Sequence, residues 1–235
     1  MVPVILTCTQ SVFREKTAAK NSGENNSVLN IPDVVINEGL PVQLSETEDL
    51  GLYLYRNPLT RDHMITYLDK LTESTRITDI ILRNANKNNI PVSLAFSLAF
   101  AESAYNPIAV NRNSNSIDRG LFQLNNKSFP NLKESEFFNP EINAQYGLAY
   151  LASCIEKGGN EIVGLAMYNA GSGRVTGRGT PKMTLDYISK IMDYKKNIDA
   201  FIMDSMVTER SIVETGNKIK NVRYVLNTEG FKSGE

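Results

Sequence analysis

The longest apolar stretch of the chain runs from Ile90 to Ala101 and contains no charged residue. Pro91 suits the first turn of a helix, where its missing N–H costs nothing. A helix that is apolar on nearly every side is expected to lie at the centre of a domain. The stretch ends at Glu102, so the pattern predicts a buried central helix that carries a carboxyl group at its end.

Amphipathic patterns predict further helices on both sides of this stretch. Apolar residues recur with helical spacing after Thr60, and again after Ser74 or Thr75, each of which is a suitable N-cap. Three more helices are expected at 140–156, 160–169 and 184–206, with glycine-rich breaks at 158–159 and 171–179. Strand signals are weak and predict only a short ribbon around residues 111–125.

The same patterns divide the chain into three parts. Residues 1–54 are predicted to be an N-terminal export or tether segment, polar from 11 to 30 and with short extended pieces from 31 to 54. Residues 55–206 form the predicted helical domain. Residues 207–235 are a polar tail in which a partial helix is expected.

Composition and charge narrow the possible functions. The chain has 41% apolar and 22% charged residues, which is typical of a globular protein, and a net charge of -1 gives no general attraction to nucleic acid. His63 is the single histidine, which argues against histidine-based triads and multi-histidine metal sites. The sequence therefore predicts no metal, no cofactor and no nucleic-acid partner.

The first eight residues are apolar and end in Cys8. They lack a basic region and are shorter than the apolar part of an ordinary signal peptide. Two interpretations remain open: the remnant of an export signal, or a lipoprotein cleavage site with the lipid on Cys8, which Thr7 matches poorly. Cys154 lies in an apolar helical stretch and is expected to be a small buried hydrophobic residue.

Glu102 is a candidate general acid. Burial disfavours the charged form of a carboxyl group and raises its pKa, so that the group keeps its proton near neutral pH. A polar loop follows, and then a turn that begins at Gly120 and contains glutamine and asparagine. The alternative is an ordinary glutamate at a helix end in solvent, and position alone favours that alternative.

Four short motifs follow one another from residue 101 to residue 188. They are Ala-Glu-Ser-Ala-Tyr-Asn-Pro at 101–107, Gly-Leu-Phe-Gln-Leu-Asn at 120–125, Ala-Met-Tyr-Asn-Ala-Gly at 166–171 and Thr-Leu-Asp-Tyr-Ile at 184–188. Each motif alone is weak, whereas four in this order are specific. Together they resemble the catalytic domain of bacterial lytic transglycosylases. The resemblance implies a predominantly α (α+β lysozyme-like) fold, with a helical catalytic domain and a flexible N-terminal segment.

The resemblance also implies a substrate and a site. The substrate would be the peptidoglycan glycan strand, cut at the MurNAc-β-1,4-GlcNAc bond with formation of 1,6-anhydro-MurNAc, and Glu102 would be both acid and base. Gly120 would let the backbone approach the sugar. An exported, periplasmic or cell-envelope protein is expected, with cell-wall or secretion-machinery proteins as further candidate partners. The implied substrate-binding residues are Ser103, Gln123, Asn125, Tyr168, Asn169 and Tyr187.

Asp118 leaves the reaction open. In animal lysozymes an aspartate just before the corresponding turn is the second catalytic carboxylate, which would make this chain a muramidase that hydrolyses the same bond. Asp118 can instead bond backbone N–H groups of its own turn, and we favour this role because the Tyr-Asn-Ala-Gly motif is typical of transglycosylases. A non-catalytic peptidoglycan-binding domain is the third hypothesis, although binding alone does not require the general acid Glu102.

Overall fold

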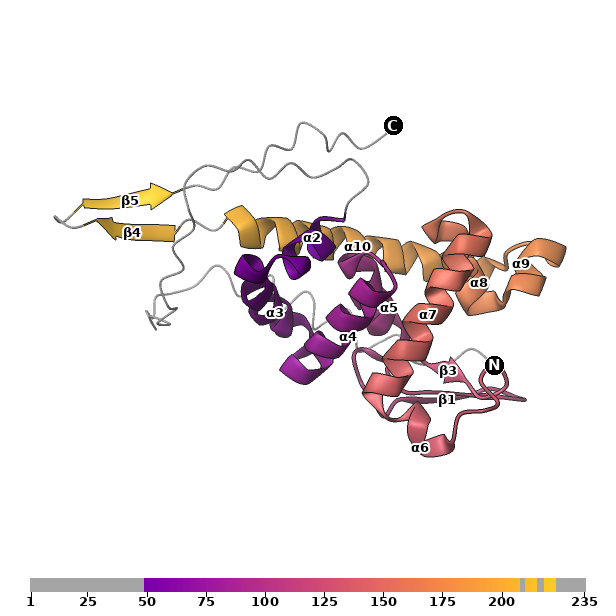
Figure 1. The fold of residues 1–235 in the computed structure, drawn as a ribbon. Coiled ribbons are helices and arrows are strands. Elements are labelled where there is room, and N and C mark those ends of the chain that lie inside the picture. Colours follow the sequence, from indigo (N-terminus) through magenta and orange to yellow (C-terminus); the bar gives the residue numbers. More distant parts are fainter. Residues whose placement is uncertain (1–48, 208–209, 215–217, 223–235) are drawn as a thin grey trace, which may run out of the picture. The chain divides into compact units, whose positions relative to one another are not determined.

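The computed structural model describes residues 49–207, 210–214 and 218–222, with side chains described for 49–203 (Figure 1). The predicted polar tether and the lipidation of Cys8 lie outside these residues. No helix among the described residues has the length and apolar character needed to cross a membrane.

Helices make up most of the described chain, which confirms the predominantly α prediction (Figure 1). They are α2 (Leu50–Arg56), α3 (Pro58–Thr72), α4 (Thr75–Lys87), α5 (Val92–Ser103), α6 (Glu134–Phe137), α7 (Pro140–Gly158), α8 (Glu161–Ala170), α9 (Ser172–Arg178) and α10 (Lys182–Val207). The strands β1 (Val110–Arg112), β2 (Ile117–Arg119) and β3 (Leu124–Asn125) form one antiparallel sheet, and β4 (Arg210–Glu214) pairs with β5 (Lys218–Val222).

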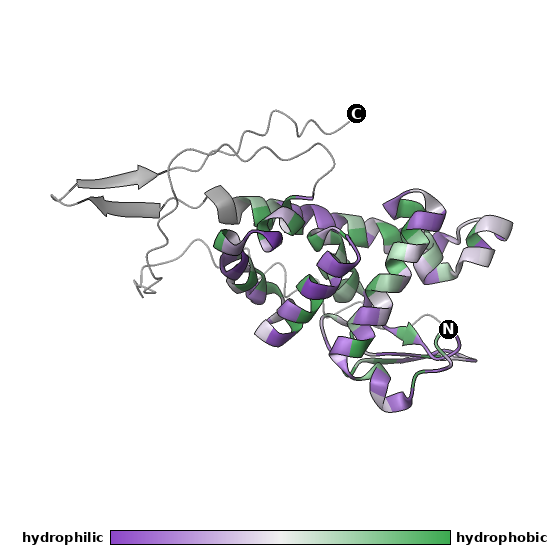
Figure 2. Ribbon diagram, viewed as in Figure 1, coloured by the Kyte–Doolittle hydropathy of each residue, from purple (hydrophilic) through white to green (hydrophobic). Residues whose placement is uncertain are grey.

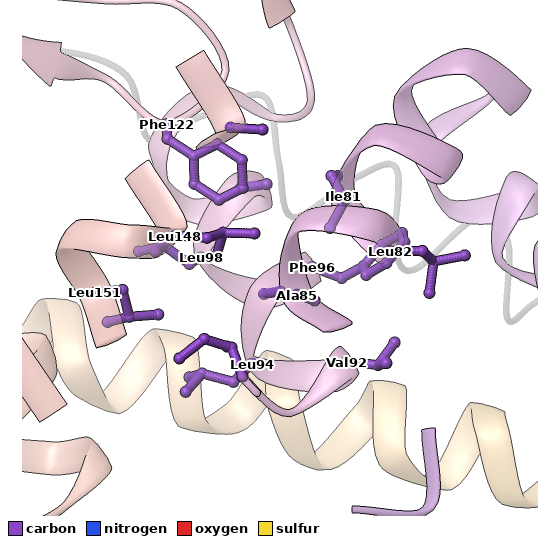
Figure 3. Close-up of a cluster of buried hydrophobic side chains, with 14 of the residues drawn as sticks. Ile81, Leu82, Ala85, Val92, Leu94, Phe96, Leu98, Phe122, Leu148 and Leu151 are labelled. Atoms are coloured by element: carbon purple, nitrogen blue, oxygen red, sulfur yellow. The ribbon is translucent and has the colours of Figure 1, made fainter. Parts of the chain in front are cut away.

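Helix α5 is the centre of the hydrophobic core, as its uncharged sequence predicts. It packs against α10 and α4, and its residues from Val92 to Ala99 are all buried. Figure 3 shows Leu94 and Leu98 of α5 close to Leu148 and Leu151 of α7. The helices around α5 carry both polar and apolar residues, as Figure 2 shows along α4. The core therefore fixes the end of α5, and with it the backbone of Glu102.

Asp49 connects the first described residues to this central helix. Its Oδ1 atom accepts hydrogen bonds from the backbone N–H of Leu52, at 2.9 Å, and from that of Val92, at 3.1 Å. One carboxylate oxygen thus caps the N-termini of both α2 and α5. Burial raises the pKa of Asp49, while the two backbone hydrogen bonds lower it.

Two predictions near the start of the domain are wrong. Residues 50–56 form helix α2 rather than an extended piece, because Asp49 caps them and Leu52 and Leu54 are buried in the core. Asn57 rather than Thr60 caps α3, since Pro58 occupies its first turn and the Thr60 hydroxyl donates to the carbonyl oxygen of Leu54.

Two further predictions towards the C-terminus are also corrected. The glycine-rich stretch expected to be a break contains helix α9. Gly173 and Gly177 lie inside this helix, because glycine weakens a helix but keeps its backbone N–H and carbonyl groups. The tail contains the strand pair β4–β5 rather than a partial helix. The cap at Ser74, the ribbon at 111–125 and the helices from residue 140 onwards are confirmed to within a few residues.

The double cap predicts that Asp49→Ala destabilises the domain by about 1–3 kcal/mol, because two backbone N–H groups lose their acceptor. Asp49→Asn is the matched control, since it keeps an acceptor oxygen, and its free energy of unfolding should stay within about 1 kcal/mol of the original value. Urea denaturation measures both. An equal loss in the two variants would show that the charge, and not the cap, matters.

Candidate active site

A cavity of about 490 Å³ lies beside the end of α5. Of the residues predicted for the site, it brings together Glu102, Asp118, Gln123, Asn125, Tyr168 and Asn169. Ser103 and Tyr187 do not line it. Sequence reasoning missed the other residues of the lining, which are Asn111, Asn113, Leu124, Ser128, Phe129, Tyr150, Ala170 and Gly171.

Glu102 reaches the cavity because helix α5 ends at the next residue, Ser103. Ala104 adopts a left-handed conformation with φ 50°, and Tyr105 follows with φ 64°. This reversal turns the chain towards the sheet, and the buried Tyr105 ring packs beside Phe96 and Phe100. The Glu102 carboxyl group is therefore left half-buried at the wall of the cavity.

The surroundings of Glu102 favour its protonated form. Burial raises the pKa of Glu102 to about 8, although the hydrogen bond from Tyr187 lowers it and the negative charge of Asp118 raises it further. The hydroxyl group of Tyr187 donates to Glu102 Oε1 at 2.5 Å. Burial and the adjacent Glu102 charge raise the pKa of Tyr187 well above its usual value, so Tyr187 remains a donor.

A tight turn between β2 and β3 supports the site residues. The side chain of Asn143, on α7, is fully buried against it. Its Oδ1 atom accepts from the backbone N–H of Phe122 at 2.7 Å. Its Nδ2 atom donates to the carbonyl oxygens of Arg119, at 2.9 Å, and Phe137, at 2.8 Å. The turn is thus bound to α7 and to the end of α6.

Two predicted site residues hold the same turn from other sides. The Ser103 hydroxyl group donates to the carbonyl oxygen of Leu121 at 2.7 Å and to that of Ala99 at 3.1 Å. The Tyr168 hydroxyl group donates to the carbonyl oxygen of Phe122 at 2.8 Å. Ser103 therefore connects α5 to the turn, and Tyr168 connects α8 to it.

The packing of the turn requires a glycine at position 120, whereas the family resemblance implies a close approach of the sugar to this glycine. Its φ is 81°, and a Cβ atom built there would lie 2.1 Å from the carbonyl oxygen of Phe137 and 2.3 Å from Asn143 Nδ2. Gly120 is also not among the residues that line the cavity.

Asp118 is held by side-chain amides, where backbone N–H groups had been expected. Its Oδ1 accepts from Asn125 Nδ2 at 2.6 Å, and its Oδ2 accepts from Asn113 Nδ2 at 2.7 Å and Asn111 Nδ2 at 3.3 Å. These contacts join all three strands of the sheet region. Both carboxylate oxygens of Asp118 are thus engaged, although the residue lines the cavity.

The amide groups at the cavity differ in what they leave free for a ligand. Asn125 also donates to Ser116 and accepts from the backbone N–H of Lys127, so the protein uses both ends of its amide. Gln123, in a left-handed conformation with φ 47°, donates to the carbonyl oxygens of Ala109 and Gly120. Only the oxygen of the Gln123 amide remains available to a ligand.

Within the part of the chain that the structure describes, no three histidine, cysteine, aspartate or glutamate residues are grouped as metal ligands would be. The polar side chains of the cavity carry carboxyl, amide and phenol groups and the hydroxyl group of Ser128. Such a site can donate and accept protons and can bind the amide and hydroxyl groups of a sugar.

Comparison with known proteins gives a family for this region. Residues 79–189 match the family model described as "Transglycosylase SLT domain". All four sequence motifs lie inside the match. Among solved structures, an inactive mutant of the lytic transglycosylase Slt from Pseudomonas aeruginosa is similar, with 21% identity and a TM-score of 0.46. The alignment covers 62% of this chain and 28% of that chain.

The turn predicts a large effect of Gly120→Ala. The new methyl group meets a backbone carbonyl group and a positive φ, so we expect a loss of about 3 kcal/mol or more in the free energy of unfolding. Gly173→Ala is the control, because its Cβ atom would meet nothing within 4 Å, and alanine there should be neutral or stabilising. Comparable losses in both variants would contradict this account.

The raised pKa of Glu102 predicts a pH-dependent stability. Because its pKa is higher in the folded chain, the protein loses stability as the pH rises from the ordinary value of 4.5 towards about 8. Glu102→Gln removes this loss and should be more stable by about 2 kcal/mol at about pH 9, with little difference near pH 5. Glu156→Gln, on the exposed side of α7, is the control. The same difference at both pH values would contradict the burial argument.

Proposed function

We propose that this chain is a peptidoglycan lytic transglycosylase that cleaves the MurNAc-β-1,4-GlcNAc bond with formation of 1,6-anhydro-MurNAc, because residues 79–189 match the transglycosylase SLT domain family model. The observation that carries this proposal is the Glu102 carboxyl group, bonded by Tyr187 and with its pKa raised by burial, at the wall of a cavity lined by amide groups and aromatic rings. We further propose that Glu102 is the single acid and base of the reaction.

The reaction has two proton transfers at the same residue. Protonated Glu102 donates to the glycosidic oxygen, the bond from that oxygen to C1 of MurNAc breaks, and an oxocarbenium-like state develops at C1. The Glu102 carboxylate then takes the proton of the 6-hydroxyl group of the same MurNAc. The 6-oxygen bonds to C1, which closes the anhydro ring and restores protonated Glu102 without consuming water.

Tyr187 supports the step between the two transfers. A hydrogen bond to an ionised carboxyl group is stronger than one to the neutral form, so the contact at 2.5 Å stabilises the carboxylate that exists after the first transfer. Since burial opposes this charged state, the carboxylate readily takes a proton back. The pair thus suits an acid that must become a base.

The substrate contacts follow from which groups remain free. Tyr168 and Tyr150 lie next to each other at the cavity, with ring centroids 5.3 Å apart, and provide a surface on which a sugar ring can stack. Gln123 offers an acceptor, and Asn169 also lines the cavity. We assign Ser103 and Asn125 to support of the site, because their polar groups bond within the protein.

The bonds of Asp118 favour transglycosylation over the lysozyme-type reaction. A second catalytic carboxylate must face the cation or a water molecule, whereas both oxygens of Asp118 accept hydrogen bonds from asparagines. Its charge instead contributes to the raised pKa of Glu102.

The peptidoglycan substrate implies export to the periplasm or cell envelope. Incorporation of labelled fatty acid would test the lipid anchor at Cys8.

Product analysis tests the proposed reaction. Purified peptidoglycan digested in water enriched in a heavy oxygen isotope should give anhydro-muropeptides that contain no heavy oxygen, as detected by mass spectrometry. Glu102→Gln should lower the rate by about a thousandfold, while Glu156→Gln should leave it unchanged. Reducing-end products that carry the isotope would overturn the proposal in favour of hydrolysis by Glu102 and Asp118.

A further inference from the structure

Thr184, in the first turn of α10, is a buried residue with a polar contact to the cavity wall. Its side chain is 2% exposed, and its hydroxyl group donates to Asn169 Oδ1 at 2.8 Å. Thr184 itself does not line the cavity, whereas Asn169 does. Tyr187 lies three residues further along the same helix and bonds Glu102. The start of α10 therefore contacts two residues of the cavity from behind.

The burial of Thr184 determines which way the Asn169 amide lies. Among the described residues, the Thr184 hydroxyl group has no other hydrogen-bond partner. If the amide were turned round, its N–H group would face the hydroxyl oxygen, and the hydroxyl hydrogen would have no acceptor. A buried donor without an acceptor is costly. The amide oxygen of Asn169 is therefore fixed towards Thr184.

The other end of the amide is consequently left for a ligand. Asn169 is exposed, and its Nδ2 atom has no partner within the described chain. The Gln123 amide is fixed the other way round. Its Nε2 atom donates to two backbone carbonyl oxygens, so its oxygen is the end left for a ligand. At the cavity Asn169 thus presents an amide donor and Gln123 an amide acceptor, each with a fixed direction. An acetamido group carries the complementary carbonyl and N–H groups.

We propose that Thr184 is a positioning residue that fixes the Asn169 amide with its N–H groups towards the cavity, and so makes the site selective for the carbonyl oxygen of an acetamido group. This inference rests on the proposed action on an N-acetylated glycan. We attribute the selectivity to the direction of a hydrogen bond and not to the shape of the cavity. Thr184→Val separates the two, because valine has nearly the same volume as threonine but no hydroxyl group.

Binding measurements with matched sugars test the inference. In the Glu102→Gln background, which prevents turnover, calorimetry compares an oligomer of N-acetylglucosamine with its de-N-acetylated counterpart. Adding Thr184→Val should weaken binding of the acetylated oligomer by about tenfold, the effect of one hydrogen bond. Binding of the de-N-acetylated oligomer should change by less than about twofold. Thr184→Ser should restore the preference.

Two other variants complete the test. Thr176→Val removes an exposed threonine hydroxyl group on α9 that bonds Ser172, and should change neither affinity. Asn169→Asp keeps an acceptor for Thr184 but removes the donor, so the preference for the acetylated oligomer should disappear even if Thr184→Val folds poorly. Equal loss for both sugars, no loss in Thr184→Val, or no rescue by Thr184→Ser would overturn the inference.

The reaction itself is judged from a different readout. If the unmodified chain gives anhydro products but Thr184→Val leaves the preference intact, only the role of Thr184 is wrong. If the chain gives hydrolytic products while Thr184→Val loses the preference, only the proposed reaction is wrong. Failure of the Glu102→Gln chain to bind the acetylated oligomer would overturn the inference about Thr184, whereas the reaction would still be decided by its products.

Discussion

The buried side chain of Asn143 fixes the turn between β2 and β3, on which the candidate active site depends. Its three hydrogen bonds fix the backbone of Arg119, Phe122 and Phe137, which come from different parts of the chain. Once the turn is fixed, its carbonyl oxygens provide acceptors for Ser103 and Tyr168. An amide is well suited to this position because it donates and accepts at once, and every partner is a neutral backbone group. The chemistry at Glu102 therefore depends on a residue that the cavity does not contain.

The site combines a carboxyl group that the fold disfavours as an anion with a phenol that stabilises the anion. Burial alone would keep Glu102 protonated but would make it a poor proton donor, because the charged state left after donation would be too costly. Tyr187 offsets part of that cost with a single strong hydrogen bond. Asp118 acts against this through its charge, at a distance and with its own oxygens engaged. The resulting pKa of about 8 is a balance between these three effects.

The sequence predicted most of the helices and the position of Glu102 at the end of a buried central helix, because both depend on local patterns. The uncharged run of α5 indicated its central position without any long-range information. Helix α2 was missed although Asp49 caps it locally, because Gly51 interrupts the pattern and the packing of this glycine against Val92 is a long-range contact. The role of Asn143 was also missed, although a signal existed. Asn143 shares the buried face of α7 with Ala144, Gly147 and Leu148, and a polar residue on an apolar face indicates specific hydrogen bonding.

The double cap by Asp49 makes the folding unit longer than the region that matches the family model. The match begins at residue 79, yet the backbone N–H of Val92, at the start of α5, donates to Asp49, and Leu52 and Leu54 fill part of the core. A fragment cut at the edge of the match would expose this core and release the start of α5. The same contact is a mechanical connection. Force applied to the chain at Asp49 would act directly on the helix that carries Glu102.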